Sequence, residues 1–460
     1  MLTAHHFGWY GIAAALYLGA KLLLSIPRPG RQARPPRPLP AMTIHAVITA
    51  YNEDPAMLRQ CLESLLDQTV RPSSLTLVDD HSTDHSAAQV LDQLRPRFAQ
   101  AGIAVNLIRF PQNRGKRHGL AAGFLDAPTA DAYLAVDSDT IAARNAVEEL
   151  LRPMARRRVH AVTGLVLAYN RATNLLTRLI DMRYVNAFLG ERVAYSRLGS
   201  VLCACGSLAL YRGWVMRKHL HDFLGQRFLE GPATFGDDRR LTYYALTEGQ
   251  SLIAPTAIGY TDVPERLGHY TRQQIRWGKS FIREGFLLAL KPRFIGRLFW
   301  WLNLLELAAW LGFTAGLIAA LAIAVTHPAG WHILAGYVTW VCVMSWVRSV
   351  HYLRRAPGLQ LRERIPTFAA APLYALLNLG LLLPLRLYSL ATPHITSWGT
   401  RHNGAEVHHD DPAPAPEPAV TDAITVPIPR PALAPDDTVP LHLLVPLDPD
   451  KTLELDLRAH

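Results

Sequence analysis

The chain has 460 residues, half of them apolar, and a formal net charge of +10. This length allows one large soluble domain and a few membrane spans, and it excludes several independent domains. A net positive charge can indicate nucleic-acid binding, but the distribution of the arginines argues against it. They gather beside apolar segments, at 28–37 and 348–364, and membrane proteins place positive charge at such positions on the cytoplasmic side. The four cysteines have no zinc-type spacing, which predicts reduced thiols in a cytoplasmic compartment.

Residues 1–40 are predicted to form a membrane anchor followed by a linker rich in proline and arginine. Residues 7–26 are largely apolar, and about 20 such residues suffice to cross a bilayer. No lysine or arginine precedes Lys21, so the N-terminus is expected outside and the linker in the cytoplasm. The stretch lacks the basic start and the small-residue cleavage site of a signal peptide, which predicts an uncleaved anchor.

Residues 41–266 are predicted to form a cytoplasmic α/β domain. Short apolar runs alternate there with stretches of helical period at 55–67 and 84–98. Strands that alternate with helices are typical of an α/β sheet, whose ligands bind at the carboxyl ends of the strands. The predicted strands are 43–50, 75–78, 105–110, 132–136 and 161–167.

Two later stretches are amphipathic, basic and aromatic, a pattern typical of helices that lie at a membrane surface. They are residues 174–198 and residues 270–290, the second of which belongs to a predicted interface segment at 267–296. For the first stretch, a soluble helix packed on the sheet explains the pattern equally well.

Residues 297–395 are predicted to be the C-terminal transmembrane region. Residues 298–325 are long enough for a full span that runs outward, and 331–347 for a short span that runs back. The arginine-rich loop at 348–364 is then cytoplasmic. A third apolar stretch, 368–390, is interrupted by two prolines and an arginine, and both a span and a re-entrant element fit it.

Polar side chains follow the first three predicted strands. Tyr51 and Glu53 come after the first strand, and Asp79 and Asp80 end the second. Because the ends of adjacent parallel strands converge, these groups are expected in one crevice suited to a base and a ribose, although the second cluster is also a common helix cap. Lys116 lies in a turn after the third strand, where its charge suits a diphosphate and where a solvated basic loop fits equally well.

Two pairs of carboxylates follow further along the chain. Asp137 and Asp139 come after the strand at 132–136, where they can hold a hard divalent ion that bridges the phosphates of a nucleotide diphosphate. Such a pair often belongs to a turn or a helix cap. Here it is expected in the same crevice as the earlier polar clusters, which favours a metal site. Asp237 and Asp238 precede a helical run and fit either a helix cap or an inverting sugar transfer, in which one carboxylate takes the proton of the acceptor hydroxyl. Asp238 is the candidate base.

Gln273, Arg276 and Trp277 lie in the second amphipathic stretch. A tryptophan can stack on the face of a sugar, and an arginine can hold a diphosphate. An interfacial helix without a catalytic part is the alternative interpretation of the same residues.

The order of these motifs resembles the processive inverting glycosyltransferases, which include the cellulose, chitin and hyaluronan synthases. The resemblance covers residues 42–404, and within the group the chain is most similar to hyaluronan synthases at 205–212, which begins with Cys205 and Gly206, and at 273–284. A segment at 396–404, with Trp398 and Arg401, supports the same choice. The motifs in chain order are Tyr51-Asn52-Glu53, Val78-Asp79-Asp80, Asn113-Arg114-Gly115-Lys116, Asp137-Ser138-Asp139, Gly236-Asp237-Asp238-Arg239 and Gln273-Gln274-Ile275-Arg276-Trp277.

The resemblance implies a nucleotide-sugar-binding domain of the GT-A type, a Mg or Mn ion, and a channel built from a transmembrane helical bundle. Carried over to this sequence, Asp139 binds the metal, and Asp238 acts as the base within a motif that includes Asp237 and Arg239. Cys205 and Gly206 belong to the substrate site. The clamp for acceptor and diphosphate consists of Gln273, Arg276 and Trp277, and Trp398 and Arg401 support the active site from the cytoplasmic side.

The implied function is a multi-pass enzyme of the plasma membrane that transfers sugars from UDP-GlcNAc and UDP-GlcA to a growing polysaccharide and translocates it. A chitin or chitooligosaccharide synthase, which uses UDP-GlcNAc alone, is the main alternative, because only one span precedes the catalytic domain. A nonprocessive transferase acting on a lipid carrier and a transporter subunit with an inactive transferase domain are further alternatives. Residues 405–460 are rich in proline and poor in aromatic residues, which predicts a disordered tail.

Overall fold

The computed structural model describes residues 4–27, 38–228, 231–233, 235–328 and 330–394. Trp398, Arg401 and the predicted tail at 405–460 lie outside the described residues. The predictions made for them therefore stay predictions.

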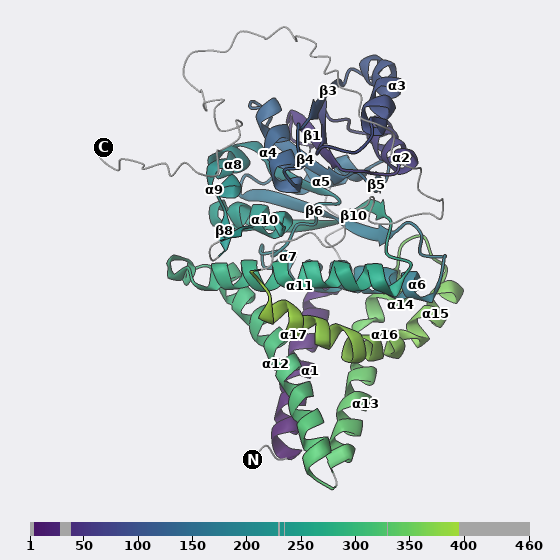
Figure 1. Cartoon of the computed structure of the whole chain (residues 1–460), viewed down its shortest axis with the longest axis vertical. Helices are drawn as coiled ribbons and strands as arrows, with labels where there is room; N and C mark the ends of the chain where they lie inside the picture. The colour runs from purple at the N-terminus through teal and green to yellow at the C-terminus, as the bar shows by residue number, and fades with distance from the viewer. Residues whose placement is uncertain (1–3, 28–37, 229–230, 234, 329, 395–460) are drawn as a thin grey trace. The chain divides into compact units, whose positions relative to one another are not determined.

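An eight-stranded mixed sheet forms the centre of the α/β domain, in the order β3-β2-β1-β4-β7-β6-β10-β5 (Figure 1). The first four strands of this order are parallel to one another, and β7 runs antiparallel to both of its neighbours. All five predicted strands are confirmed, while β5, β7 and β10 were not predicted. The strands are β1 (Ile44–Ala50), β2 (Ser74–Asp79), β3 (Ala104–Arg109), β4 (Ala132–Asp137), β5 (Thr140–Ala142), β6 (Val159–Ala168), β7 (Ala209–Arg212) and β10 (Gln250–Thr261).

Helices cover both faces of this sheet, because successive side chains of a strand point to opposite faces. On β1, Ala46 and Ile48 join one hydrophobic core, whereas Val47 joins the other. Burying a large aliphatic side chain contributes roughly 1.5–3 kcal/mol to the stability of the fold. The two cores together therefore hold the strands, and with them the loops at the strand ends, in place. The first core is covered by α2 (Pro55–Leu66), α3 (Ser86–Gln100) and α5 (Ala146–Met154), and the second by α4 (Lys116–Asp126), α8 (Gly213–Lys218), α9 (Leu220–Leu224) and α10 (Asp237–Glu248).

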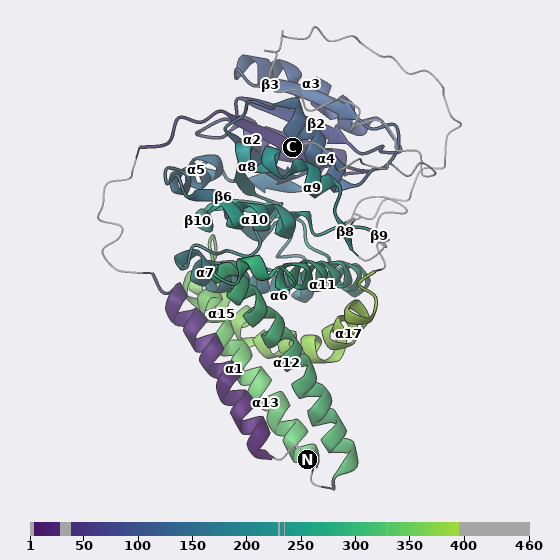
Figure 2. The same cartoon turned by 90° about the vertical axis from the view of Figure 1, so that its left-hand side faces the viewer.

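Amphipathic helices lie between the sheet and the apolar helices (Figures 1 and 2). The stretch predicted at 174–198 forms α6 (Leu175–Val185), the π-helical segment η2 (Asn186–Arg192) and α7 (Val193–Arg197). On α6, Leu179 packs in one core with Leu167 of β6 and with Tyr352 of the apolar helical run Gly330–Arg355. This stretch therefore contacts the sheet on one side and the apolar helices on the other. The second predicted stretch is α11 (Leu267–Ala289), and β8 (Arg227–Phe228) and β9 (Gly231–Pro232) form a small ribbon.

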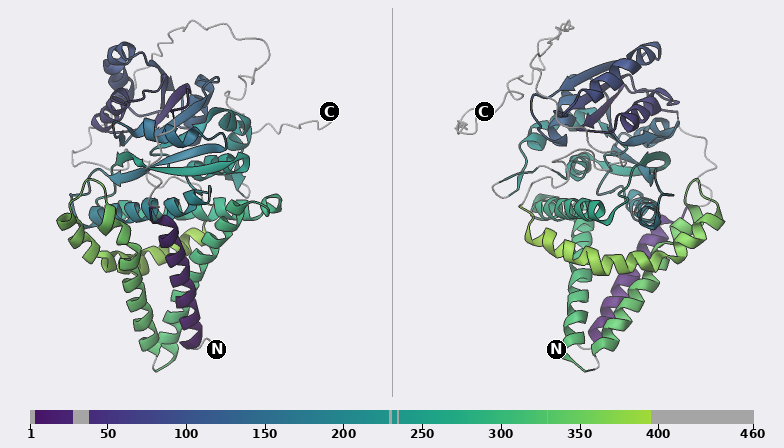
Figure 3. Two further views of the ribbon diagram at one scale, coloured as in Figure 1. Left: turned by 180° about the vertical axis from the view of Figure 1, so that it is seen from behind. Right: turned by 45° about the vertical axis from the view of Figure 1, so that its right-hand side comes forward.

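Three helical runs among the described residues are long and apolar enough to cross a membrane, at Leu298–Thr326, Gly330–Arg355 and Leu361–Ala391. The first is α12 (Leu298–Thr326), which follows the short turn η3 (Pro292–Phe294). Together with α1 (Ala4–Ser25) and α13 (Gly330–Arg348), α12 runs away from the sheet (Figures 2 and 3).

The chain beyond α13 differs from the sequence prediction. Much of the predicted loop at 348–364 is helical, in α14 (Val350–Arg355) and the start of α15 (Leu361–Ala369). The apolar stretch that follows forms α16 (Ala371–Leu377), η4 (Asn378–Leu382) and α17 (Leu383–Ala391), and α17 runs alongside α11 (Figure 1). Pro372 stands in the first turn of α16, where a missing backbone N–H removes no helical hydrogen bond. Pro384 directly follows the π-helical segment η4, and a local π adjustment of this kind accommodates a proline within a helical run.

Candidate active site

The carboxyl ends of β1, β2 and β4 meet at one edge of the sheet, as predicted, because β1 pairs in parallel with both neighbours. Asp79 and Asp80 are buried, with 1% and 2% of their surface exposed. The carboxylate of Asp80 accepts hydrogen bonds from the backbone N–H groups of Arg114 and Gly115, at 2.6 and 2.8 Å. Asp79 accepts one from the backbone of Ser82 at 2.9 Å. Both aspartates thus shape the loops of the crevice.

Lys116 and Asp137 form an ion pair at the entrance of α4. The second carboxylate oxygen of Asp137 accepts a hydrogen bond from the Ser207 hydroxyl at 3.0 Å. Burial alone would lower the pKa of Lys116, but the charges of Asp137 and Asp238 outweigh it and raise this pKa above its ordinary value. The lysine stays charged, and in this structure it neutralises carboxylates of the site.

Asp139 lies at the point where β5 and β10 come together. Its Oδ1 accepts hydrogen bonds from the hydroxyl groups of Thr140 and Thr261, at 3.3 and 3.2 Å. Within the described ranges, no group of three or more His, Cys, Asp or Glu side chains could hold a metal ion.

Asp238 stands in the first turn of α10 and packs against Gly206. A Cβ atom at residue 206 would overlap the Asp238 carboxylate, so this approach requires glycine. Burial raises the pKa of Asp238, Lys116 lowers it, and Asp137 raises it further, so that the pKa lies above the ordinary value of an aspartate. A carboxylate with a raised pKa is a stronger base, which suits proton abstraction from a hydroxyl.

Asp237, directly before Asp238, has different surroundings. Its carboxylate accepts a hydrogen bond from the Arg117 guanidinium at 2.7 Å, and both side chains are at least 96% buried. The Arg239 guanidinium donates a hydrogen bond to the Tyr243 hydroxyl at 3.4 Å and lies 5.0 Å from the centre of the Phe281 ring. Of the three residues predicted to be catalytic, Asp237 and Arg239 thus have partners within the protein that fix the start of α10.

The helix α11 holds the loop that leads into Asp238. The Arg283 guanidinium donates a hydrogen bond to the carbonyl oxygen of Phe235, and Glu284 forms an ion pair with Arg240 at 3.0 Å. Glu284 is fully buried and also accepts a hydrogen bond from Gln226. The loop is therefore fixed from both sides of the Asp237-Asp238 pair.

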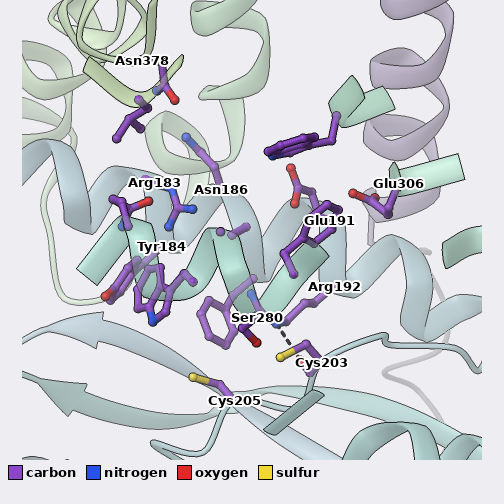
Figure 4. A pocket seen from close by; sticks show the side chains of 18 of the residues that line it. Arg183, Tyr184, Asn186, Glu191, Arg192, Cys203, Cys205, Ser280, Glu306 and Asn378 are labelled. Carbon is purple, nitrogen blue, oxygen red and sulfur yellow. Dashed lines mark hydrogen bonds between the residues drawn. The ribbon is translucent and has the colours of Figure 1, made fainter. Parts of the chain in front are cut away.

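One large cavity of about 990 Å³ joins these residues to the membrane-side helices. The predicted site residues that line it are Glu53, Lys116, Asp137, Asp139, Cys205, Asp237, Asp238, Arg239, Gln273, Arg276 and Trp277, whereas Tyr51, Asp79, Asp80 and Gly206 do not line it. Side chains from α1, α6, η2, α12, α13 and α17 also contribute to the wall. Figure 4 shows part of it, from Cys203 and Cys205 at the sheet to Glu306 on α12. The crevice and the apolar helices thus share this cavity.

Comparisons with known proteins agree with this geometry. The sequence profile of Glycosyl transferase family 2 matches residues 45–220, and that of Glycosyl transferase family group 2 matches residues 134–383. The chain belongs to glycosyl transferase family 2. The transferase is 37% identical to a hyaluronan synthase of Streptococcus pyogenes, over 86% of this chain and 90% of that protein. It is 32% identical to an N-acetylglucosaminyltransferase of Mesorhizobium japonicum, over 90% of this chain and 95% of that protein.

The fold of the transferase is of the GT-A type. A solved mannosyltransferase from Pyrobaculum calidifontis, in complex with GDP-Man and Mn²⁺, matches 80% of this chain and 99% of its own chain. The TM-score is 0.54 and the sequence identity 19%, so this likeness concerns the fold.

Sequence reasoning missed several residues of the site. Arg117, Ser207, Arg283 and Glu284 hold Asp237, Asp137 and the loop before Asp238 in place. Arg283 and Glu284 belong to the stretch 273–284, which carries the resemblance to hyaluronan synthases. That resemblance is the sequence signal by which these two residues could have been found. Cys205 was predicted to bind substrate. Burial and the nearby Asp238 raise the pKa of its thiol to about 12, so the thiol stays protonated at neutral pH.

Proposed function

We propose that this family 2 transferase is a processive hyaluronan synthase of the plasma membrane, with its catalytic domain in the cytoplasm. The observation that carries the proposal is the single cavity, which is lined both by Asp238 and by membrane-side helices such as α12. A polymer extended at Asp238 can therefore advance between those helices without leaving the enzyme. The hyaluronan synthase of Streptococcus pyogenes, which matches over 86% of this chain, supports the choice of polymer.

The transfer step is an in-line displacement at the anomeric carbon of a UDP-sugar. The carboxylate of Asp238 takes the proton of the acceptor hydroxyl, and the oxygen attacks the anomeric carbon. The bond from this carbon to the diphosphate oxygen breaks, UDP leaves with the bonding electrons, and the configuration inverts. Lys116 holds Asp137, and Gln273, Arg276 and Trp277 receive the acceptor and the diphosphate.

The donor set of the site fits a divalent cation, either Mg²⁺ or Mn²⁺. Asp139 lines the cavity two residues after Asp137, and Mg²⁺ sites in such enzymes combine one or two carboxylates with phosphate oxygens of the substrate. A metal held by Asp139, with Asp137 nearby, supplies positive charge that favours departure of the diphosphate. In such a site, phosphate oxygens of the nucleotide sugar would supply further ligands.

A chitooligosaccharide synthase is the second candidate. It is favoured by the similarity to the N-acetylglucosaminyltransferase of Mesorhizobium japonicum over 90% of this chain.

One experiment separates the two candidates. Purified full-length protein in lipid nanodiscs is incubated with Mn²⁺ or Mg²⁺ and labelled UDP-GlcNAc, with and without UDP-GlcA, and the product size is measured. Polymer that forms only with both donors supports hyaluronan synthesis. Polymer from UDP-GlcNAc alone refutes it and identifies the second candidate, and products of one or two added sugars contradict processive synthesis altogether.

A further inference from the structure

The cavity wall on the membrane side carries an excess of positive charge. This wall is the set of cavity-lining residues on α1, α6, η2, α7, α12, α13, α16, η4 and α17. Its two carboxylates are both paired within the protein: Glu306 with Lys21 at 2.7 Å, and Glu191 with Arg348. Three arginines remain, namely Arg183, Arg192 and Arg386.

None of these three arginines forms an ion pair within the part of the chain that the structure describes. The Arg183 guanidinium lies 5.5 Å from the centre of the Trp277 ring. That of Arg386 lies between two rings, 5.8 Å from Trp310 and 5.2 Å from Phe313. Arg192 donates a hydrogen bond to the carbonyl oxygen of Cys203 at 3.1 Å.

Aromatic rings stabilise a guanidinium only in part. A cation over a ring gains less than one that binds a carboxylate directly. Arg386 lies in the apolar run Leu361–Ala391, where an arginine without an ion-pair partner marks a candidate functional site. Pores that pass anions are lined by arginine and lysine. The charge of Glu191 reaches Arg183, but its direct ion pair is with Arg348. An anionic occupant of the cavity would give Arg183 and Arg386 a direct partner.

Asn186 supplies an independent indication of a ligand. It lies three residues after Arg183, at the start of η2, and 7% of its surface is exposed. Its side-chain amide donates to the Ser349 hydroxyl at 3.1 Å, but its Oδ1 has no hydrogen-bond partner among the described residues. Buried carbonyl oxygens of this kind nearly always accept a hydrogen bond. Figure 4 shows Asn186 and Arg183 close together in the cavity wall.

We propose that Arg183, Asn186 and Arg386 form a polymer-binding subsite for an acidic sugar unit. The guanidinium groups bind the carboxylate of a uronic acid, and Asn186 Oδ1 accepts a hydrogen bond from a hydroxyl or amide of the polymer. The inference deepens the proposed function and rests on it, because a neutral polymer would give these arginines no direct ion-pair partner. Arg183 lies beside Trp277, and Arg386 lies beside Trp310 and Phe313 of α12. The proposed subsite thus extends from the acceptor residue toward α12, and we assign it to sugars that have already been transferred.

The test is equilibrium binding of two matched oligosaccharides to full-length protein in nanodiscs with UDP present. The probes are a hyaluronan hexasaccharide and its carboxyl-reduced, neutral form. We expect the wild type to bind the acidic form about tenfold more tightly, since a charge-assisted hydrogen bond contributes about that much. Arg183→Gln and Arg386→Gln should each lose most of this preference and leave the affinity for the neutral form unchanged.

Arg178→Gln is the matched control, because Arg178 is exposed on the same helix and does not line the cavity. It should bind both probes as the wild type does. Equal affinity of the wild type for the two probes overturns the subsite, and so does failure to bind either; this comparison needs no variant. A product that contains only GlcNAc refutes the proposed function, whereas an alternating product combined with equal affinities refutes the subsite alone.

Discussion

Replacement of Asp238 by asparagine tests the assignment of the base. The change keeps the size of the side chain and its contact with Gly206, but asparagine cannot take a proton. Because a positioned base contributes about 10²–10⁴-fold to the rate, we expect kcat to fall by this factor, which corresponds to about 3–5 kcal/mol in activation free energy. The affinity for UDP should stay within about twofold of the wild type, since the substitution leaves the other cavity-lining residues in place.

The neighbouring aspartate provides a chemically identical comparison. Asp237 is paired with Arg117, and the side chains are only 4% and 3% exposed, so water does not screen the pair. Asp237→Asn leaves a buried guanidinium without its counter-ion, which costs about 3–5 kcal/mol of stability. We therefore expect Asp237→Asn to lower the temperature of thermal inactivation strongly, and Asp238→Asn to leave it almost unchanged.

The assay combines UDP release at saturating donors, UDP binding by calorimetry, and thermal inactivation, all on protein in nanodiscs. Asp92→Asn is the control for the chemistry of the substitution, because Asp92 is 65% exposed and lies outside the cavity. Turnover of Asp238→Asn at the wild-type rate would refute the base assignment. If Asp237→Asn lost activity without losing stability, Asp237 rather than Asp238 would be the base.

Three further predictions concern the surroundings of the base. Lys116→Gln removes a charge that lowers the pKa of Asp238, so this pKa rises, and because the base acts when ionised, the acidic limb of the kcat profile should move to higher pH; an unmoved limb contradicts the coupling. Glu284→Gln breaks a buried ion pair with Arg240 and should cost about 3 kcal/mol of stability, with the double variant Arg240→Gln/Glu284→Gln less destabilised than the sum of the two. Asp139→Ala should abolish activity and remove the effect of Mn²⁺ on UDP affinity measured by calorimetry; Mn²⁺-dependent UDP binding by this variant would exclude Asp139 as a ligand.

The sequence predicted the parallel half of the sheet because its strands are continuous apolar runs that end in polar motifs. Strand β7 has only four residues, Ala209–Arg212, too few for a periodic pattern. Strand β10 contains Pro255, and its pairing with β6 shifts register between Ile253 and Ile258, so its alternation is broken. Both strands depend on pairing with distant segments, which a local pattern does not reveal.

The candidate site was predicted as a set of residues rather than as a set of contacts. Asp139, Asp238 and Trp277 line one cavity. The sequence placed Asp139 after a strand, Asp238 at the start of a helix and Trp277 on an amphipathic helix. The pairing of Asp237 with Arg117 joins residues 120 positions apart, and nothing in either local sequence indicates it. The sequence showed Arg183 only as part of a basic amphipathic stretch. Which arginines of the wall have an ion-pair partner depends on the three-dimensional structure, so the sequence could not single out Arg183.

The helix α11 has one further consequence for how the enzyme can change. Gln273 and Trp277 line the cavity, while Arg283 and Glu284 hold the loop of Asp238 further along the same helix. An α-helix turns by about 100° and rises about 1.5 Å per residue. A single residue inserted between Trp277 and Arg283 would rotate one group of side chains away from its target while the other stayed in place. Helical geometry thus fixes the number of residues between Trp277, at the sugar site, and Arg283, which supports the base. We expect any change of length within this short stretch to impair catalysis.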